Sequence, residues 1–177
     1  RVESDKFSVR SHQLANHAWE EGWLEEEVFP VGSLTRDEGI RPGTNEEALS
    51  SLRTVFSEDG QVTAGNASQV SDGASAVLIA SEEAAEELGL PVLARIVEYA
   101  TSGVEASRVM SAPIPTVRML LEKTGRSIGE IDIIEHNEAF ASASCAIRKS
   151  LEVPEGSFNP HGGAIAIGHP LGATGTR

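Results

Sequence analysis

Strands that alternate with helices along this chain predict an α/β fold in which helices cover the sheets. Two observations carry the prediction. Short apolar runs bounded by glycine, proline or aspartate are typical of buried strands. Longer segments between them repeat their apolar residues at helical spacing and end at glycine or proline. The runs expected to form strands are 74–80, 92–100 and 131–134.

The first part of the chain is predicted to be mainly helix and loop. Apolar residues recur at helical spacing over residues 5–22, where Gly22 ends the helix. A short extended piece leads to Val31, and glycines and prolines make 33–44 a loop. A second, short helix is expected over 46–55.

Three further helices are expected to alternate with the strands. Ser81 precedes an acidic first turn, and Gly89 closes that helix. The next covers 113–123 and stops at Gly125. The last covers 137–151, directly after the third strand.

Composition bounds the class of protein. The chain has 177 residues, enough for one domain or parts of two, with a mean hydropathy of −0.16. No apolar run approaches the ~20 residues of a membrane span. A net charge of −13 argues against a nucleic-acid or anionic-membrane partner. The one cysteine, Cys145, excludes an internal disulfide, fits a reducing compartment such as the cytoplasm, and is expected to be a small buried hydrophobe.

Both ends of the sequence look like cuts. The chain starts at Arg1 without a methionine or signal peptide, and it stops at Arg177 inside an expected helix. We therefore expect it to be a fragment of a longer chain.

One histidine near the end, His169, lies in a glycine-rich segment and is followed by Pro170. The surrounding glycines are Gly162, Gly163, Gly168, Gly172 and Gly175. Proline suits the first turn of a helix, so we expect a buried strand, a turn carrying His169, and a helix from about Pro170. The positive end of the helix dipole favours a neutral imidazole, which can accept a proton at neutral pH. The alternative is a glycine-rich turn with an incidental histidine; the spacing fits neither a P-loop nor a dinucleotide fingerprint.

A second polar group lies where the strand 131–134 meets the next helix. Asn137 and Glu138 stand at this junction, and open α/β sheets bind ligands at the carboxyl ends of their strands. Each also has a purely structural interpretation. Asn137 could cap the helix, and Glu138 in its first turn would be explained by the helix dipole.

Taken whole, residues 159–175 read Asn-Pro-His-Gly-Gly-Ala-Ile-Ala-Ile-Gly-His-Pro-Leu-Gly-Ala-Thr-Gly. This string closely resembles the active-site histidine motif of the thiolases. Asn-Glu-Ala-Phe-Ala at 137–141 resembles the family's second motif and precedes the first in the family's order. Residues 5–12 resemble the helix that opens the family's loop domain. Residues 37–42, 63–68 and 72–74 are similar to its coenzyme A-binding loop region and the strand after it.

The resemblance implies an acyl-CoA C-acyltransferase that forms or cleaves 3-ketoacyl-CoA by Claisen chemistry. It implies coenzyme A or acyl-CoA as substrate and no permanently bound cofactor or metal. His169 would activate a nucleophilic cysteine thiol and bind a thioester oxygen, and Asn137 would hold a water that completes this oxyanion site. Arg41 would lie near the nucleotide phosphates and Ser68 near the pantetheine arm. The alternatives are a solvated arginine and a turn serine.

The resemblance also implies a domain plan. The parent would have two α/β halves in a five-layer αβαβα fold, and this chain would be a part of it with mixed sheets covered by helices. Residues 1–70 would be loop domain, 71–92 the end of the N-terminal half, and 93–177 the first part of the C-terminal half. Both catalytic-cysteine segments would lie outside it, and the parent would be a homodimer or homotetramer.

Two other functions remain open on the sequence: a thiolase-like module that binds coenzyme A without turnover, and a structural subunit of an acyltransferase assembly. The presence of both His169 and Asn137 favours the enzyme, because a binding module has little use for an oxyanion pair.

Overall fold

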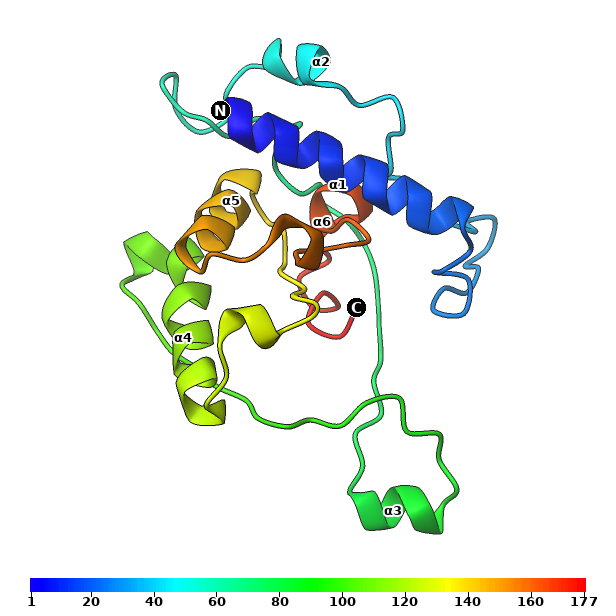
Figure 1. Cartoon of the computed structure of the whole chain (residues 1–177). Helices are drawn as coiled ribbons and strands as arrows, with labels where there is room; N and C mark the ends of the chain where they lie inside the picture. Colours follow the sequence, from blue (N-terminus) through cyan, green and yellow to red (C-terminus); the bar gives the residue numbers. More distant parts are fainter.

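The computed structural model describes residues 1–177 and is built from helices and long connections (Figure 1). It has six α-helices: α1 (Val2–Glu20), α2 (Glu46–Ser50), α3 (Glu82–Glu87), α4 (Pro113–Thr124), α5 (Ala141–Ser150) and α6 (Ala164–Ile167). Three short 3₁₀ helices lie between them: η1 (Ala106–Ser111), η2 (Ile128–Glu130) and η3 (Glu155–Ser157).

The core lies between α1, α5 and α6. In Figure 1 the long helix α1 lies across these two shorter helices. Phe7 of α1, Ile147 of α5 and Ile165 of α6 belong to one buried cluster, and the ring of Phe158 meets that of Phe7 edge to face. Burial of such side chains contributes roughly 1.5–3 kcal/mol each. The packing therefore fixes α1 against both segments that carry candidate site residues.

The local signals for helix ends are confirmed. Ser81 precedes α3 and accepts a hydrogen bond at Oγ from the amide of Ala84, 3.2 Å away. Gly125 ends α4 with a φ of 66°, a left-handed conformation that glycine adopts without strain. Helix α1 is as predicted but begins at Val2. Helix α2 ends at Ser50, five residues before the predicted 55.

The predicted strands do not form sheet ladders, and this corrects the expectation of buried strands. Segments 74–80 and 92–100 are extended but unpaired, and their apolar side chains face solvent; Leu93 is 97% exposed. They lead to and from α3, away from the other helices (Figure 1). A strand is buried only when neighbouring strands and helices cover it, and this chain places none there. Of 131–134, only Ile134 pairs, in one isolated parallel bridge with Phe158.

Three elements near the candidate site also differ from expectation. Helix α5 begins at Ala141 rather than 137, and the expected strand before His169 is the short helix α6. A run of alternating alanine and isoleucine is too short for periodicity to separate strand from helix. The helix expected from about Pro170 is not formed: residues 171–176 form turns, in which the Thr174 amide donates to the Pro170 carbonyl at 3.0 Å.

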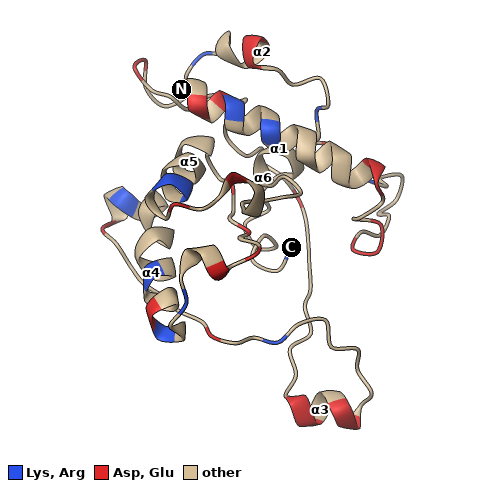
Figure 2. Cartoon of the chain, viewed as in Figure 1, with Lys and Arg blue, Asp and Glu red and all other residues tan.

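The charge distribution is acidic, with 27 acidic against 14 basic residues. Figure 2 shows acidic residues at both ends of α3, whereas α4 and α5 carry several of the basic ones. None of the helices combines the length and the apolar composition needed to cross a membrane. Cys145 is buried in α5, as expected, and burial raises the pKa of its thiol to about 11.

Candidate active site

Two side chains from separate parts of the chain, Asn137 and His169, meet in the structure. Asn137 Nδ2 lies 3.1 Å from His169 Nε2. Asn137 is exposed and His169 half-buried, so the pair stays open to solvent. The residues stand 32 positions apart, and the packing beneath α1 brings their segments together. This contact places an amide and an imidazole side by side, where both can face one ligand atom.

Thr174 defines which imidazole nitrogen carries the proton. Its Oγ1 lies 2.8 Å from His169 Nδ1 and donates its own hydrogen to the Pro170 carbonyl at 3.0 Å. Because that hydrogen is used, Oγ1 accepts from Nδ1–H. The lone pair of His169 then lies on Nε2, facing Asn137 and the open side. The site therefore presents a base at Nε2.

Asn137 does not cap a helix. The residue before α5 is Phe140, and no side chain caps this helix end. The capping interpretation of Asn137 is therefore wrong, and its amide is available to His169. The assignment of Glu138 to a first helical turn is wrong for the same reason, because α5 starts three residues later.

The segment after Asn137 pairs with the stretch that carries Ser68. The Ser68 amide donates to the Ala139 carbonyl at 2.9 Å, and the Ala141 amide donates to the Asn66 carbonyl at 2.9 Å. These are the hydrogen bonds of a short antiparallel pairing around Ala67 and Phe140. Ser68 is thus held next to the segment of Asn137.

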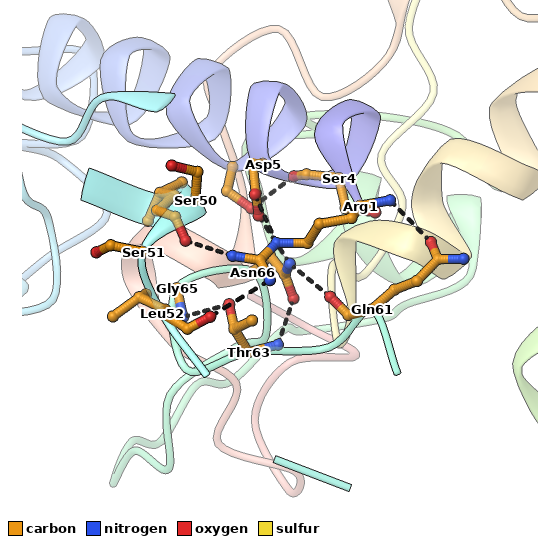
Figure 3. A network of polar contacts seen from close by, with 12 residues as sticks. Arg1, Ser4, Asp5, Ser50, Ser51, Leu52, Gln61, Thr63, Gly65 and Asn66 are labelled. Carbon is orange, nitrogen blue, oxygen red and sulfur yellow. Dashed lines mark hydrogen bonds and ion pairs between the residues drawn. The ribbon is translucent and has the colours of Figure 1, made fainter. Parts of the chain in front are cut away.

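A polar network joins the stretch that carries Ser68 to the start of α1 (Figure 3). Asn66 Nδ2 donates to Asp5 Oδ1 at 2.9 Å, and Asn66 Oδ1 accepts from the Thr63 amide at 2.8 Å. Asp5, which is buried, also forms an ion pair with Arg1 at 2.6 Å. The network therefore anchors the Ser68 stretch to a rigid helix.

Arg41 lies apart from these residues. Its side chain is exposed, no carboxylate lies within ion-pair distance, and its backbone amide donates to His12 Nδ1 at 3.2 Å. Burial and the nearby Arg41 charge together lower the pKa of His12 to about 4. The structure shows no contact between Arg41 and the pair Asn137–His169. Asp37, which is close to Arg41 in the sequence, forms an ion pair with Arg177, which follows the segment that carries His169.

An open apolar pocket of about 330 Å³ lies beside the Asn137 segment. Phe140, three residues after Asn137, is part of its wall, and the ring of Phe56 meets that of Phe140 edge to face. The lining residues are Phe56, Val62, Met110, Phe140, Ser142 and Ala143.

Sequence reasoning missed the environment of Glu138. This side chain is completely buried between the segments of Asn137 and His169, where Ser11 and Asn159 donate to it. Its partners lie 127 and 21 residues away in the sequence, so no local pattern indicates them.

Comparison with known proteins identifies the family. Residues 1–83 match the family model "Thiolase, N-terminal domain", and residues 90–177 match "Thiolase, C-terminal domain". The two models together account for nearly the whole chain. The chain belongs to the thiolase family.

Several relatives are similar along its full length. An acetyl-CoA acetyltransferase of Paracoccus denitrificans is 44% identical over 100% of this chain and 47% of its own length. The structure of human mitochondrial 3-ketoacyl-CoA thiolase in complex with CoA has a TM-score of 0.95 and 43% identity over 99% of this chain and 45% of its own. The structure of the dimeric peroxisomal thiolase of Saccharomyces cerevisiae has a TM-score of 0.94 and 44% identity over 99% of this chain and 46% of its own. The expected thiolase fold is thereby confirmed, and the chain spans about half the length of these relatives.

Proposed function

We propose that this chain supplies the histidine–asparagine part of an acyl-CoA C-acyltransferase that forms or cleaves 3-ketoacyl-CoA. The observation that carries the proposal is the Asn137–His169 contact, with the imidazole lone pair on the exposed Nε2. The proposed reaction also requires a nucleophilic thiol, and Cys145 does not supply it. We call the chain together with the part that supplies this thiol the complete enzyme.

The chemistry follows from the two side chains. His169 Nε2 takes the proton of the nucleophilic thiol, and the thiolate attacks the 3-keto carbonyl of the substrate. The bond between the α- and β-carbons breaks, its electron pair passes to the departing acetyl-CoA, and the second catalytic thiol of the complete enzyme donates the proton that the α-carbon receives. The acyl group then moves from sulfur to the thiol of a free coenzyme A. Asn137 and His169 donate hydrogen bonds, one of them through a water, to the thioester oxygen that gains charge.

Further residues of this chain would bind the substrate. We place Ser68 near the pantetheine arm, since it lies beside the Asn137 segment. The apolar pocket next to Phe140 suits an uncharged part of the same ligand. Arg41 is assigned to the nucleotide phosphates because its guanidinium is exposed and forms no ion pair within the chain.

The domain plan, assembly and compartment form part of the proposal. We divide the chain into residues 1–70, 71–92 and 93–177, and the two family models meet near the second boundary, between 83 and 90. A homodimer or homotetramer is favoured by the similarity to a thiolase described as dimeric. A reducing compartment such as the cytoplasm agrees with the single free Cys145.

The proposal is tested by incubating the complete enzyme with a 3-ketoacyl-CoA and coenzyme A and separating the products by chromatography. We expect acetyl-CoA and a shortened acyl-CoA in equal amounts. Binding of coenzyme A without turnover would instead identify a thiolase-like binding module and contradict the proposal.

The 177-residue chain alone is expected to show no thiolysis or condensation above buffer. Its only thiol, Cys145, is buried, its pKa is raised to about 11, and Sγ lies 3.8 Å from the Glu3 carbonyl. In the complete enzyme, Cys145→Ala should accordingly leave kcat within about twofold of wild type. Turnover by the chain alone that Cys145→Ala abolishes would contradict this.

In the complete enzyme, Arg41→Ala is expected to raise KM for coenzyme A about 10-fold at low salt and to leave kcat almost unchanged. A remote phosphate contact contributes equally to ground-state and transition-state binding, and a charge-assisted hydrogen bond is worth about 1.5–3 kcal/mol. Arg126→Ala, at another exposed arginine, is the matched control and should not change KM. A large loss of kcat at constant KM would place Arg41 elsewhere.

A further inference from the structure

Glu138 is a buried acidic residue without a basic partner. Its side chain is fully enclosed, and no arginine, lysine or histidine lies within ion-pair distance. The other buried carboxylate, Asp5, forms an ion pair with Arg1. Arg10, which is near Glu138, pairs with Glu155 instead. A buried, unpaired charge is costly, so this carboxylate needs strong hydrogen bonds or a role that an apolar residue cannot perform.

Three donors from three segments converge on this carboxylate. Ser11 Oγ in α1 donates to Oε2 at 2.6 Å, and the Ile165 amide at the start of α6 donates to the same oxygen at 3.3 Å. Asn159 Nδ2 donates to Oε1 at 2.8 Å. Both oxygens of Glu138 are therefore acceptors.

The orientation of each donor is determined by other contacts. Asn159 Oδ1 accepts from the His136 amide at 2.7 Å, so its NH₂ group must face Glu138. Ser11 Oγ accepts from the Gly163 amide at 3.1 Å, which directs its own hydrogen to the carboxylate. Burial raises the pKa of the Glu138 carboxyl, and the hydrogen bonds from its neighbours oppose that rise. Because the three groups that form hydrogen bonds with Glu138 are all donors, they favour the ionised form of its carboxyl group.

The segments joined in this way carry the two catalytic candidates. Glu138 directly follows Asn137, and Ile165 belongs to the helix that ends two residues before His169. Gly163 packs so closely on the carboxylate that an added Cβ would lie 2.4 Å from Glu138 Cδ. The segment 139–141 is held independently by its pairing with 66–68. Loss of the hydrogen bonds to Glu138 should therefore let the segments of Asn137 and His169 shift relative to one another, while residues 139–141 stay paired with 66–68.

We propose that Glu138 is a positioning residue, whose buried carboxylate joins the Asn137 segment to the α6 segment and thereby sets the contact between Asn137 and His169. The role in catalysis rests on the proposed function, whereas the role in geometry does not. Glu138 itself touches no substrate.

The decisive variant is Glu138→Gln in the complete enzyme. Glutamine has nearly the same size, but its NH₂ group must face a donor, either Asn159 Nδ2 or the Ile165 amide. We expect kcat to fall on the order of 10²-fold, the loss typical of a misplacement of about 1 Å. KM for coenzyme A should stay within about threefold, because its proposed contacts at Arg41 and Ser68 are untouched.

The matched control is Glu130→Gln, which also replaces a hydrogen-bonded carboxylate by its amide, but in η2, where Oε2 accepts from the Ser127 amide at 2.7 Å and from Ser127 Oγ at 2.8 Å. Both variants are compared at equal folded fraction, measured by thermal unfolding. Glu130→Gln should keep kcat within about threefold of wild type. Equal kcat losses in the two variants would show that Glu138 acts only through stability and would overturn the proposal.

Crystal structures of wild type and Glu138→Gln give a readout that does not depend on activity. We expect the separation between Asn137 Nδ2 and His169 Nε2 to exceed hydrogen-bond distance in the variant; an unchanged 3.1 Å would overturn the proposal even if no acyltransferase activity existed. If Glu138→Gln does not fold, Ser11→Ala removes one donor and should produce a smaller change of the same kind. In Ser11→Ala, an unchanged distance between Asn137 Nδ2 and His169 Nε2, together with a kcat equal to that of wild type, would then contradict the proposal.

Discussion

Replacing His169 by alanine in the complete enzyme is expected to lower kcat by at least about 10⁴-fold. The substitution removes two contributions at once. One oxyanion donor is worth about 10²–10³ in rate, and a positioned base adds about 10²–10⁴. Nε2 can serve both purposes because Thr174 holds the proton on Nδ1. Asn137→Ala, which removes only the oxyanion contribution, should lower kcat by about 10²–10³-fold.

The two variants should also differ in the reactivity of the nucleophilic thiol. Loss of the His169 base lowers the thiolate fraction, so alkylation of that thiol at neutral pH should slow in His169→Ala. It should stay close to wild type in Asn137→Ala. Binding of coenzyme A, measured by calorimetry, should survive both substitutions. Equal losses of kcat, or unchanged alkylation in the histidine variant, would mean that His169 does not activate the thiol.

Features determined by neighbouring residues could be predicted from the sequence. Ser81 at the start of α3 and Gly125 at the end of α4 act through contacts within a few residues, and both appear as expected. Cys145 is likewise predicted to be a small buried hydrophobe, and it is buried in α5. Asn137 and His169 are proposed as site residues because each lies in a motif that resembles one of the thiolases, although neither motif could show that the two side chains touch.

Features that depend on distant partners could not be predicted in this way. The apolar runs 74–80 and 92–100 read as buried strands, but strand formation requires neighbours that local sequence does not specify. Glu138 was interpreted through the helix dipole because a helix was expected from 137, whereas Ser11, 127 residues earlier, helps to determine its environment. Such a contact follows from the packing of α1 on α6, which only the fold reveals.

The close approach of α1 to the candidate site gives a stability prediction: Gly162→Ala is expected to destabilise the complete enzyme by about 2–6 kcal/mol. Gly162 has a φ of 78°, and an added Cβ would lie 2.4 Å from the Ser11 carbonyl oxygen and 2.7 Å from the Ala15 amide nitrogen. A left-handed non-glycine residue costs about 1–3 kcal/mol, and overpacking against fixed atoms adds about 1–3 kcal/mol. Both contacts are backbone atoms of α1, which cannot move aside as a flexible side chain would.

Two control variants separate these costs in urea unfolding. Gly89→Ala, with a φ of 62° and nothing within 4 Å of its Cβ, measures the conformational strain alone and should cost about 1 kcal/mol. Gly129→Ala, with open space and no positive φ, should lie within about 0.5 kcal/mol of wild type. A Gly162→Ala midpoint equal to that of Gly89→Ala would mean that α1 does not press against residue 162. If the loss is as large as expected, the contact of α1 with Gly162 stabilises the same segment whose amide at Gly163 orients Ser11 toward Glu138.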